Sequence, residues 1–338
     1  MNRGDMTRGL RAIGVCVVTV MFVTGCGAAH ALLGIHEAPK ANAASAPLTV
    51  DQATRILTRE LTAAFRGEAM MGAVSRAALE AAYTGEGLRA QSARVKLARV
   101  QPAVAHSSLL APQRTELLAV SRGFGFPRFI IAQTVAVAGS LPILYLLTCP
   151  DAATPYRIAM SAEMVPPATV KPFDPLSHGS SLVNDGTGLV VAPLGLLKAY
   201  AAWMAFPAKS AISPSFAADS FSGQVRDGAA SVAKAVAAQA TFSQVHKVVT
   251  NSAYAVRQAS GDALVFGVIE RTDFFAVKPG QIVNTAANKA FVLLTGRKTV
   301  SKAASITTLE LLVFAVPRST GPTTLVAARE QVVAGSGS

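Results

Sequence analysis

The residue with the clearest chemical role in this sequence is Cys26, which follows a short apolar run near the N-terminus. Arg3, Arg8 and Arg11 precede the run, which extends over residues 12–23. Basic residues, an apolar segment and then small residues form the three-part layout of a secretory signal. The small residues here end in a thiol, and a thiolate is nucleophilic enough to accept a lipid. The sequence therefore predicts an exported chain with a cysteine that can be modified.

The tetrapeptide Val23-Thr24-Gly25-Cys26 resembles the lipobox of bacterial lipoproteins. In that family the cysteine thiol is thioether-linked to diacylglycerol and the peptide is cut just before it, which would make Cys26 the first residue of the mature chain. Val23, Thr24 and Gly25 would then be recognised by the signal peptidase. A transmembrane helix needs about 20 apolar residues, which is more than this run provides. A buried core helix is also not favoured for this run, because such a helix seldom lies between an Arg-rich end and a polar tail.

Length and charge limit what the mature chain can be. Cys26 to Ser338 suits one large domain or two of ordinary size, and 51% hydrophobic with 15% charged residues excludes global disorder. The formal charge is +12, and +10 remains after the cut because residues 1–25 carry three Arg and one Asp. Anionic lipids or acidic wall polymers are the expected partners, whereas nucleic acid is not expected for an exported lipoprotein. Translation can begin at Met1 or Met6.

The cysteines indicate no disulfide framework. Cys16 is discarded with the signal peptide and Cys26 takes the lipid, so Cys149 has no cysteine to pair with. Cys149 ends the apolar run 144–149. The sequence therefore predicts a buried structural thiol there.

Two other groups of residues have the side chains of catalytic sites. Residues 178–181 (His-Gly-Ser-Ser) and Asp185 offer the types of a hydrolase triad, but they lack a Gly-x-Ser-x-Gly elbow, so a solvated loop is favoured. Glu270 and Asp273 flank Arg271. Three positions apart on a strand, the two carboxyl groups point to opposite faces, which favours a surface ion pair with Arg271 over acid–base chemistry.

Metal and ligand sites have little support in the sequence. The five histidines are scattered and show no His-x-x-x-His spacing, so neither a metal nor another cofactor is predicted. Phe124, Phe126 and Phe129 form an aromatic cluster that could line the mouth of an apolar cavity. Core packing is the favoured interpretation of that cluster.

The elements that must position these residues follow from hydrophobic periodicity and from Gly and Pro punctuation. Helices are predicted from Thr49 to about Phe65 and over residues 73–82, 87–97, 196–206 and 228–242. Strands are predicted over residues 116–121, 128–137, 141–148, 156–164, 245–259, 263–277, 289–294, 306–316 and 323–332. Short turns between consecutive strands favour antiparallel pairing, and residues 335–338 are predicted as a frayed end.

The order of helices followed by strands occurs twice, which is typical of an α+β chain. Two domains, each with helices on a bent antiparallel sheet, are predicted to follow a signal peptide and a flexible tether. The predicted boundaries are 1–25 for the signal peptide, 26–47 for the tether, 48–170 for the first domain, 171–193 for a linker and 194–333 for the second domain.

Four short motifs carry a resemblance to known families: Tyr83-Thr84-Gly85, Phe126-Pro127-Arg128, residues 260–266 (Ser-Gly-Asp-Ala-Leu-Val-Phe) and residues 313–317 (Val-Phe-Ala-Val-Pro). Over residues 48–333 the chain resembles a domain-of-unknown-function family of actinobacterial lipoproteins. Each half is similar to the cone-shaped α+β fold of the nuclear transport factor 2-like and cystatin-like superfamilies. The lipoprotein family carries no established activity, so the resemblance implies location and fold alone.

We therefore expect a protein on the outer face of the cell membrane, held by acyl chains at Cys26, with a non-catalytic binding or scaffolding role towards an envelope partner. One alternative is a carrier of an apolar or lipid ligand, which predicts a continuous apolar cavity of several hundred Å³. Another is a nuclear transport factor 2-like enzyme, which predicts an acidic residue or a His buried on an inward strand face. Because the polar candidates fall mostly in turns, the enzyme is the least favoured.

Overall fold

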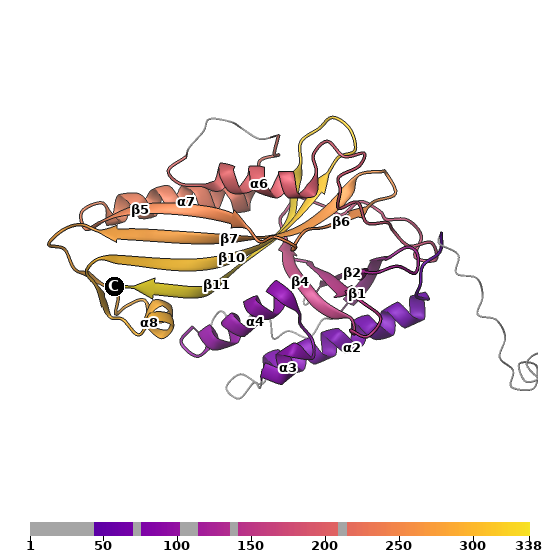
Figure 1. Ribbon diagram of the computed structural model, residues 1–338, viewed down its shortest axis with the longest axis horizontal. Helices are drawn as coiled ribbons and strands as arrows, with labels where there is room; N and C mark the ends of the chain where they lie inside the picture. The colour runs from indigo at the N-terminus through magenta and orange to yellow at the C-terminus, as the bar shows by residue number, and fades with distance from the viewer. Residues whose placement is uncertain (1–43, 70–75, 102–113, 136–140, 209–214) are drawn as a thin grey trace, which may run out of the picture. The chain divides into compact units, whose positions relative to one another are not determined.

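The computed structural model describes residues 44–69, 76–101, 114–135, 141–208 and 215–338 (Figure 1). Residues 43–338 form one structural unit. The predicted signal peptide and most of the predicted tether lie outside the described residues. Helices and one large antiparallel sheet make up the described part, which confirms the α+β class.

Nine antiparallel strands form the main sheet of the described residues. Their order is β1 (Arg114–Val120), β2 (Arg128–Val135), β3 (Ile143–Cys149), β4 (Arg157–Met164), β11 (Thr324–Gly337), β10 (Ala303–Val316), β7 (Ala263–Val277) and β5 (Ala240–Val248), with β6 (Tyr254–Arg257) also paired to β7. A separate two-stranded ladder joins β8 (Val283–Asn284) to β9 (Thr299–Val300). The longest ladder runs between β7 and β10, from Ala263 opposite Val316 to Ala276 opposite Ala303.

The two halves of the chain meet in this one sheet. Strand β4 of the first half pairs with β11 of the second through Met164 opposite Ala327 and Glu163 opposite Ala328. The predicted linker is also paired to both halves, because Ser180 bridges to Ser121 and Leu182 bridges to Val256. The division into two domains is therefore not confirmed.

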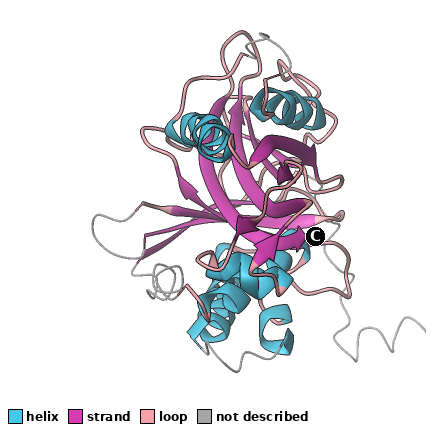
Figure 2. Ribbon diagram, turned by 90° about the vertical axis from the view of Figure 1, so that its left-hand side faces the viewer, coloured by secondary structure: helices cyan, strands magenta, loops and turns pink. Residues whose placement is uncertain are grey.

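Helices lie on both sides of the strands (Figure 2). They are α2 (Val50–Ala69), α3 (Arg76–Glu80), α4 (Gly85–Ala98), α6 (Pro193–Met204), α7 (Ser220–Val236) and α8 (Lys289–Thr295). Helix α2 contacts β1 and β2, α4 contacts β4 and β11, and α6 and α7 contact β5. The buried Glu60 of α2 also accepts hydrogen bonds from Arg157 of β4 at 3.2 Å.

Three apolar clusters form the core of the described residues. Phe129 of β2, Phe266 of β7 and Val313 of β10 are fully buried in one common cluster, although they come from distant strands. Alternate residues of β2, such as Ile130, face α2 in a second cluster. Phe314 of β10 belongs to a third cluster beneath α6. Fully burying each such side chain stabilises the fold by about 1.5–3 kcal/mol.

Several predicted elements differ from the structure. Residues 289–294 are not a strand but helix α8, because the Asn288 side chain caps the Phe291 amide at 3.0 Å and Gly296 ends the helix with φ 73°. The predicted helix over 228–242 begins earlier, at Ser220, and gives way to β5 at Ala240. Residues 245–259 hold two strands, not one. The predicted frayed end at residues 335–338 is instead largely strand, since β11 pairs with β10 as far as Gly337.

Candidate functional site

Helix α6 is held close to the sheet by apolar side chains. It begins with Pro193, which is suited to the first helical position, and buries Leu197 and Tyr200 against the strands. Gly267 of β7 permits this approach, since a Cβ there would lie 2.5 Å from the Leu197 side chain. The Tyr200 hydroxyl forms a 2.8 Å hydrogen bond with Ser222 of α7. The two helices are thereby joined above the sheet.

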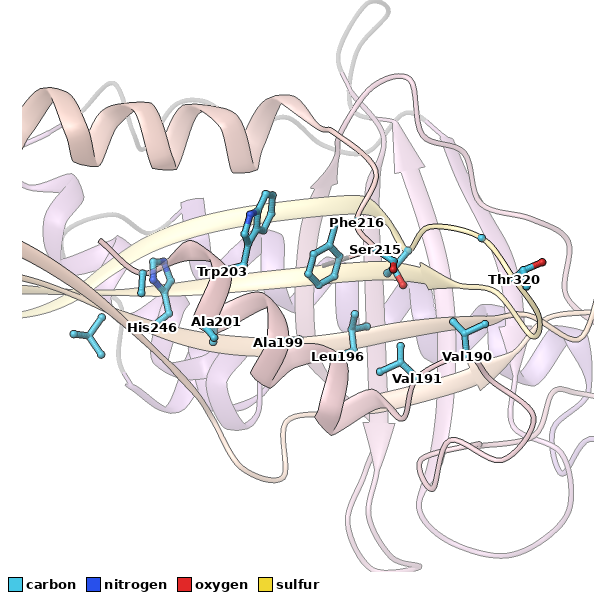
Figure 3. A pocket seen from close by; sticks show the side chains of 15 residues that line it. Val190, Val191, Leu196, Ala199, Ala201, Trp203, Ser215, Phe216, His246 and Thr320 are labelled. Carbon is cyan, nitrogen blue, oxygen red and sulfur yellow. The ribbon is translucent and has the colours of Figure 1, made fainter. Parts of the chain in front are cut away.

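A cavity of about 840 Å³, here called the α6 pocket, lies along the flank of α6 (Figure 3). Its walls are mainly aliphatic and aromatic: Val190, Val191, Leu196, Trp203, Phe216 and Val245. Four alanines of α6 and its C-terminal end complete them: Ala199, Ala201, Ala202 and Ala205. His246 and Val190 lie at opposite ends of the pocket in Figure 3. The pocket is therefore elongated, with an apolar middle.

The aromatic wall of the α6 pocket is ordered by ring contacts. Trp203 stacks on Phe216 with centroids 5.5 Å apart and planes 26° apart. Tyr200 meets both rings edge-on, at 5.7 and 5.4 Å. The Arg226 guanidinium lies 4.8 Å from the centroid of the Trp203 ring, within the range of a cation–π contact. These contacts fix the wall without a ligand.

A buried pair of a histidine and a glutamate lies at one end of this pocket. His246 extends from β5, directly across from Arg271 of β7, and its Nε2 lies 3.3 Å from Oε1 of Glu310 on β10. Both side chains are fully buried, with 0% exposure. The second nitrogen of His246, Nδ1, has no hydrogen-bond partner within the described residues.

Arg271 extends the pair into a network. Its Nη1 donates to Glu310 Oε1 at 3.0 Å and also contacts Glu330, and its Nε lies 3.5 Å from Asp273 Oδ1. Gln244 donates from Nε2 to Asp273 Oδ1 at 2.8 Å. Glu310 and Glu330 stand directly opposite each other on β10 and β11, so two like charges meet at one position of the ladder.

The electrostatics of the network follow from its composition. Burial works against the charge of Arg271, but Glu330, Glu310 and Asp273 outweigh it and raise the pKa of its guanidinium. Burial raises the pKa of Glu330, and Arg271 opposes that shift only in part. Among the described residues, one guanidinium thus faces three carboxyl groups.

A smaller cavity of about 350 Å³, the α7 pocket, lies between α7 and the sheet. Its polar lining consists of Gln224 of α7 and four network residues, Gln244, Arg271, Asp273 and Glu330. Its apolar lining includes Phe221, Val225, Val232, Phe242, Phe275 and Ile306. The network therefore reaches both cavities, through His246 at the α6 pocket and through these four residues at the α7 pocket.

The three residues of the predicted aromatic cluster lie in different surroundings. Phe129 is fully buried in the core. Phe124 and Phe126 are 44% and 40% exposed, and Arg128 lies 4.3 Å from the centroid of the Phe126 ring. None of the three lines either pocket. The cluster is divided because Phe129 lies inside a strand, whereas the other two residues lie in the turn before it.

The predicted thiol role of Cys149 is confirmed. Its side chain is buried, and Sγ donates to the carbonyl oxygens of Asp151 at 3.1 Å and Thr154 at 3.0 Å. Burial raises the pKa of this thiol, which keeps it protonated and unreactive. Val23, Thr24, Gly25 and Cys26 lie outside the described residues.

The two predicted polar groups have different outcomes. Residues 178–181 and Asp185 form no triad, since His178 is exposed and the Asp185 carboxylate accepts from the Thr187 hydroxyl at 2.6 Å. Glu270 and Asp273 do point to opposite faces. Glu270 pairs with Arg89 of α4 at 2.8 Å, so only Asp273 is a partner of Arg271, and that pair is part of the network rather than an isolated surface pair.

The sequence does not predict the network, although one pattern points to it. Polar residues two positions apart inside a strand share a face, as do Gln244 with His246 and Arg271 with Asp273. Glu310 is the lone charged residue in a run of apolar ones, over residues 309–316. The enzyme alternative required a buried His or acid on an inward strand face, and His246 and Glu310 occupy such positions.

Comparisons of the chain with protein-family models, curated proteins and solved structures give no match. Within the described residues, no group of three or more His, Cys, Asp or Glu side chains is arranged to hold a metal ion. No described helix combines the length and apolar character required to cross a membrane.

Proposed function

We propose that this protein is a lipid-anchored lipoprotein of the outer face of the cell membrane that binds an apolar or amphipathic small molecule in the α6 pocket. The observation that carries the proposal is the pocket itself. Its 840 Å³ lies within the 300–1,000 Å³ typical of small-molecule sites. Apolar ligand surface transferred into it from water contributes about 25 cal/mol per Å².

The walls favour binding because they are ordered beforehand. The stack of Trp203 on Phe216 and the edge contacts of Tyr200 define one side. A ligand then loses its own freedom on binding but orders few protein side chains, which improves affinity for a given buried area. Thr320 adds a polar group at one end, which suits an amphipathic molecule.

The location is supported by the signal-like N-terminus and by one basic surface. Five cations, Lys278, Lys289, Arg297, Lys298 and Lys302, lie between Asp273 and Glu310 without an intervening acidic residue, and all five are exposed. Ile282, within the same stretch, is 65% exposed. Such a surface, here called the basic end, complements anionic lipid headgroups.

The ligand proposal is tested by native mass spectrometry of the protein extracted from membranes of cells that produce it. Ala202 is exposed and lines the α6 pocket, so Ala202→Phe fills the pocket without disturbing the core. We expect a bound small molecule on the wild type and none on Ala202→Phe. Ala230→Phe, at an exposed position of α7 that lines neither pocket, serves as control. Equal ligand on all three proteins would contradict the proposal.

The anchor is tested by the intact mass of the membrane fraction, comparing the native chain with Cys26→Ala. We expect a mature N-terminus at Cys26 that carries diacylglycerol, and its loss from the variant. An uncleaved or unlipidated native chain would overturn the lipoprotein assignment.

A second function, acid–base chemistry on the bound molecule, is favoured by the His246–Glu310 pair at the end of the α6 pocket. A carboxylate that orients a His is a common arrangement for a general base. Glu310→Gln keeps the shape of the side chain and removes its charge. If the protein is an enzyme, the molecule recovered from this variant differs chemically from that recovered from the wild type; identical molecules would leave binding as the sole role.

A further inference from the structure

We infer that the α7 pocket is a second binding site, specific for a small organic cation: an ammonium or amidinium group on an apolar body. The site is separate from the α6 pocket, and no described residue lines both cavities. The inference therefore does not depend on the proposed ligand of the α6 pocket.

Carboxyl groups outnumber cations beside the α7 pocket. Asp273 and Glu330 line the α7 pocket, and Glu310 lies behind them in the same network. Arg271 is the cation that contacts all three carboxyl groups, so negative charge exceeds positive charge among them. The Asp273 and Glu330 side chains are 18% and 39% exposed, so an organic cation in the pocket could reach both carboxyl groups and supply the missing charge.

The lining of the α7 pocket also includes an unpaired hydrogen-bond acceptor. Gln244 is buried and lines the pocket, and because its Nε2 donates to Asp273, its unpaired Oε1 is an acceptor. The unpaired Oε2 of Glu310 lies deeper in the same network and does not line the pocket. Arg271 Nε is an unpaired donor in the same network and lies 3.5 Å from Asp273 Oδ1. The unpaired acceptor of Gln244 in the pocket lining is therefore left for an ammonium group, which donates hydrogen bonds.

The apolar lining of the α7 pocket defines the rest of the ligand. Phe242 and Phe275 lie with ring centroids 5.1 Å apart, and Phe221, Val225 and Ile306 also line the cavity. A volume of about 350 Å³ is near the lower limit for small-molecule sites, so it suits a body the size of one ring. A metal ion fits less well, because the guanidinium occupies the space between the carboxyl groups, where a hard cation would need several oxygen ligands.

The experiment uses the full-length chain in a nonionic detergent and isothermal titration calorimetry at pH 7, with a detergent-only titration subtracted. The probes are phenethylamine and benzamidine, which are cations, together with the neutral 2-phenylethanol and the anionic phenylacetate. We expect both cations to bind and the neutral and anionic probes to bind at least tenfold more weakly. The absence of cation binding up to millimolar concentration, or equal binding of 2-phenylethanol, would overturn the inference.

Amino-acid substitutions test whether phenethylamine binds in the α7 pocket. Glu330→Gln and Asp273→Asn should each weaken phenethylamine binding at least tenfold. Asp227→Asn removes the same charge from an exposed position of α7 and should leave it unchanged. Gly228 lines the pocket and has open space beside it. Gly228→Phe therefore fills the cavity without removing charge, and it should also abolish phenethylamine binding. This variant tests the site even if the charge variants do not fold.

One further variant separates this inference from the proposed function. Ala202→Phe fills the α6 pocket alone and should leave phenethylamine binding unchanged. If Ala202→Phe abolished phenethylamine binding while Gly228→Phe did not, the cation site would lie in the other cavity and the inference would be wrong.

Discussion

Asp262 shows how a single carboxylate in a turn ties distant segments together. It lies in the turn between β6 and β7, directly before Ala263, and accepts from Lys171 Nζ at 2.7 Å and from the Arg318 backbone amide at 3.0 Å. The Lys171 hydrogen bond is the main cause that lowers the pKa of Asp262 below its ordinary value of 3.8. One side chain therefore joins the loop after β4, the β6–β7 turn and the loop after β10.

We predict that Asp262→Asn lowers the free energy of unfolding at pH 7 by about 1.5–3 kcal/mol, the range for hydrogen bonds to charged groups. Because the pKa is lower in the folded state, the stabilisation is present above the ordinary value of 3.8 and is lost as the pH falls from there towards the folded pKa. Urea unfolding between pH 7 and pH 3 should show the difference between wild type and variant narrowing below about pH 4. A difference that stays constant down to pH 3 would contradict this account.

Residue identity alone predicts some of these features and misses others. The buried thiol of Cys149 follows from its apolar neighbours, because a small apolar group in such a run is buried whatever the topology. The network around Arg271 does not follow in this way. Its members come from four strands, and register, which brings Glu310 opposite Glu330, is a property of the pairing rather than of any one segment.

Among the elements, the packing of α4 against β4 depends on Gly87, which has no side chain. Gly87 lies against β4 so closely that a Cβ would approach the Ala159 carbonyl oxygen to 2.6 Å and the Ile158 carbonyl oxygen to 2.9 Å. Backbone atoms of a central strand cannot move aside as a flexible side chain can. Gly223 of α7 is also helical, but a Cβ there would meet no atom within 4 Å.

We predict opposite effects of the same substitution at these two glycines. Gly87→Ala should destabilise the protein by about 1–3 kcal/mol, as overpacking does. Gly223→Ala should stabilise it by about 0.5–1 kcal/mol, because alanine loses less backbone entropy in a helix. Thermal unfolding of the two variants beside the wild type provides the measurement. If both variants were stabilised, the close contact of α4 with β4 would be disproved.

The elements were predicted best where periodicity is long and worst where it is short. Strand β7 has the predicted bounds, residues 263–277. The apolar run at 289–294 is too short to distinguish a strand from a helix by pattern. The N-cap at Asn288 and the C-cap at Gly296 favour the helix, α8. Helix α7 begins well before its predicted start, at Ser220, where the Asp219 side chain caps the Ser222 amide at 2.7 Å.

At the scale of the whole molecule, topology could not be predicted from the sequence. The repeated order of helices and strands suggested two separate sheets, whereas β4 and β11 join both halves into one. That joint consists of two residue pairs, Met164 with Ala327 and Glu163 with Ala328, which lie far apart in the sequence, and no local pattern encodes such a contact. The α+β class, by contrast, depends on the order of local elements, which hydrophobic periodicity reveals.

The basic end predicts how the molecule responds to lipid charge. In a full-length chain with Cys26→Ala, reversing Lys298 and Lys302 to Glu should weaken binding to vesicles that contain phosphatidylglycerol at least tenfold, since each cation near such a surface contributes about 1 kcal/mol. Binding to phosphatidylcholine vesicles should not change. Co-sedimentation at low salt is the measurement, and the effect of the charge reversal should diminish at high salt.

The matched control for this charge reversal is the pair Arg55→Glu and Arg66→Glu, two exposed cations of α2. This pair changes the net charge equally at a different surface and should leave binding to anionic vesicles nearly intact. A loss as large as that at the basic end would show that net charge alone, not this surface, governs the contact.

The central claim, that the α6 pocket receives an apolar ligand, is tested most directly through Trp203, the one tryptophan of the chain, which lines the pocket. Titration with the neutral apolar dye N-phenyl-1-naphthylamine should produce saturable energy transfer from Trp203. We predict dye affinity at least tenfold lower for Ala202→Phe and unchanged for Ala230→Phe. Energy transfer that does not saturate, or that survives Ala202→Phe with the same affinity, would contradict the claim.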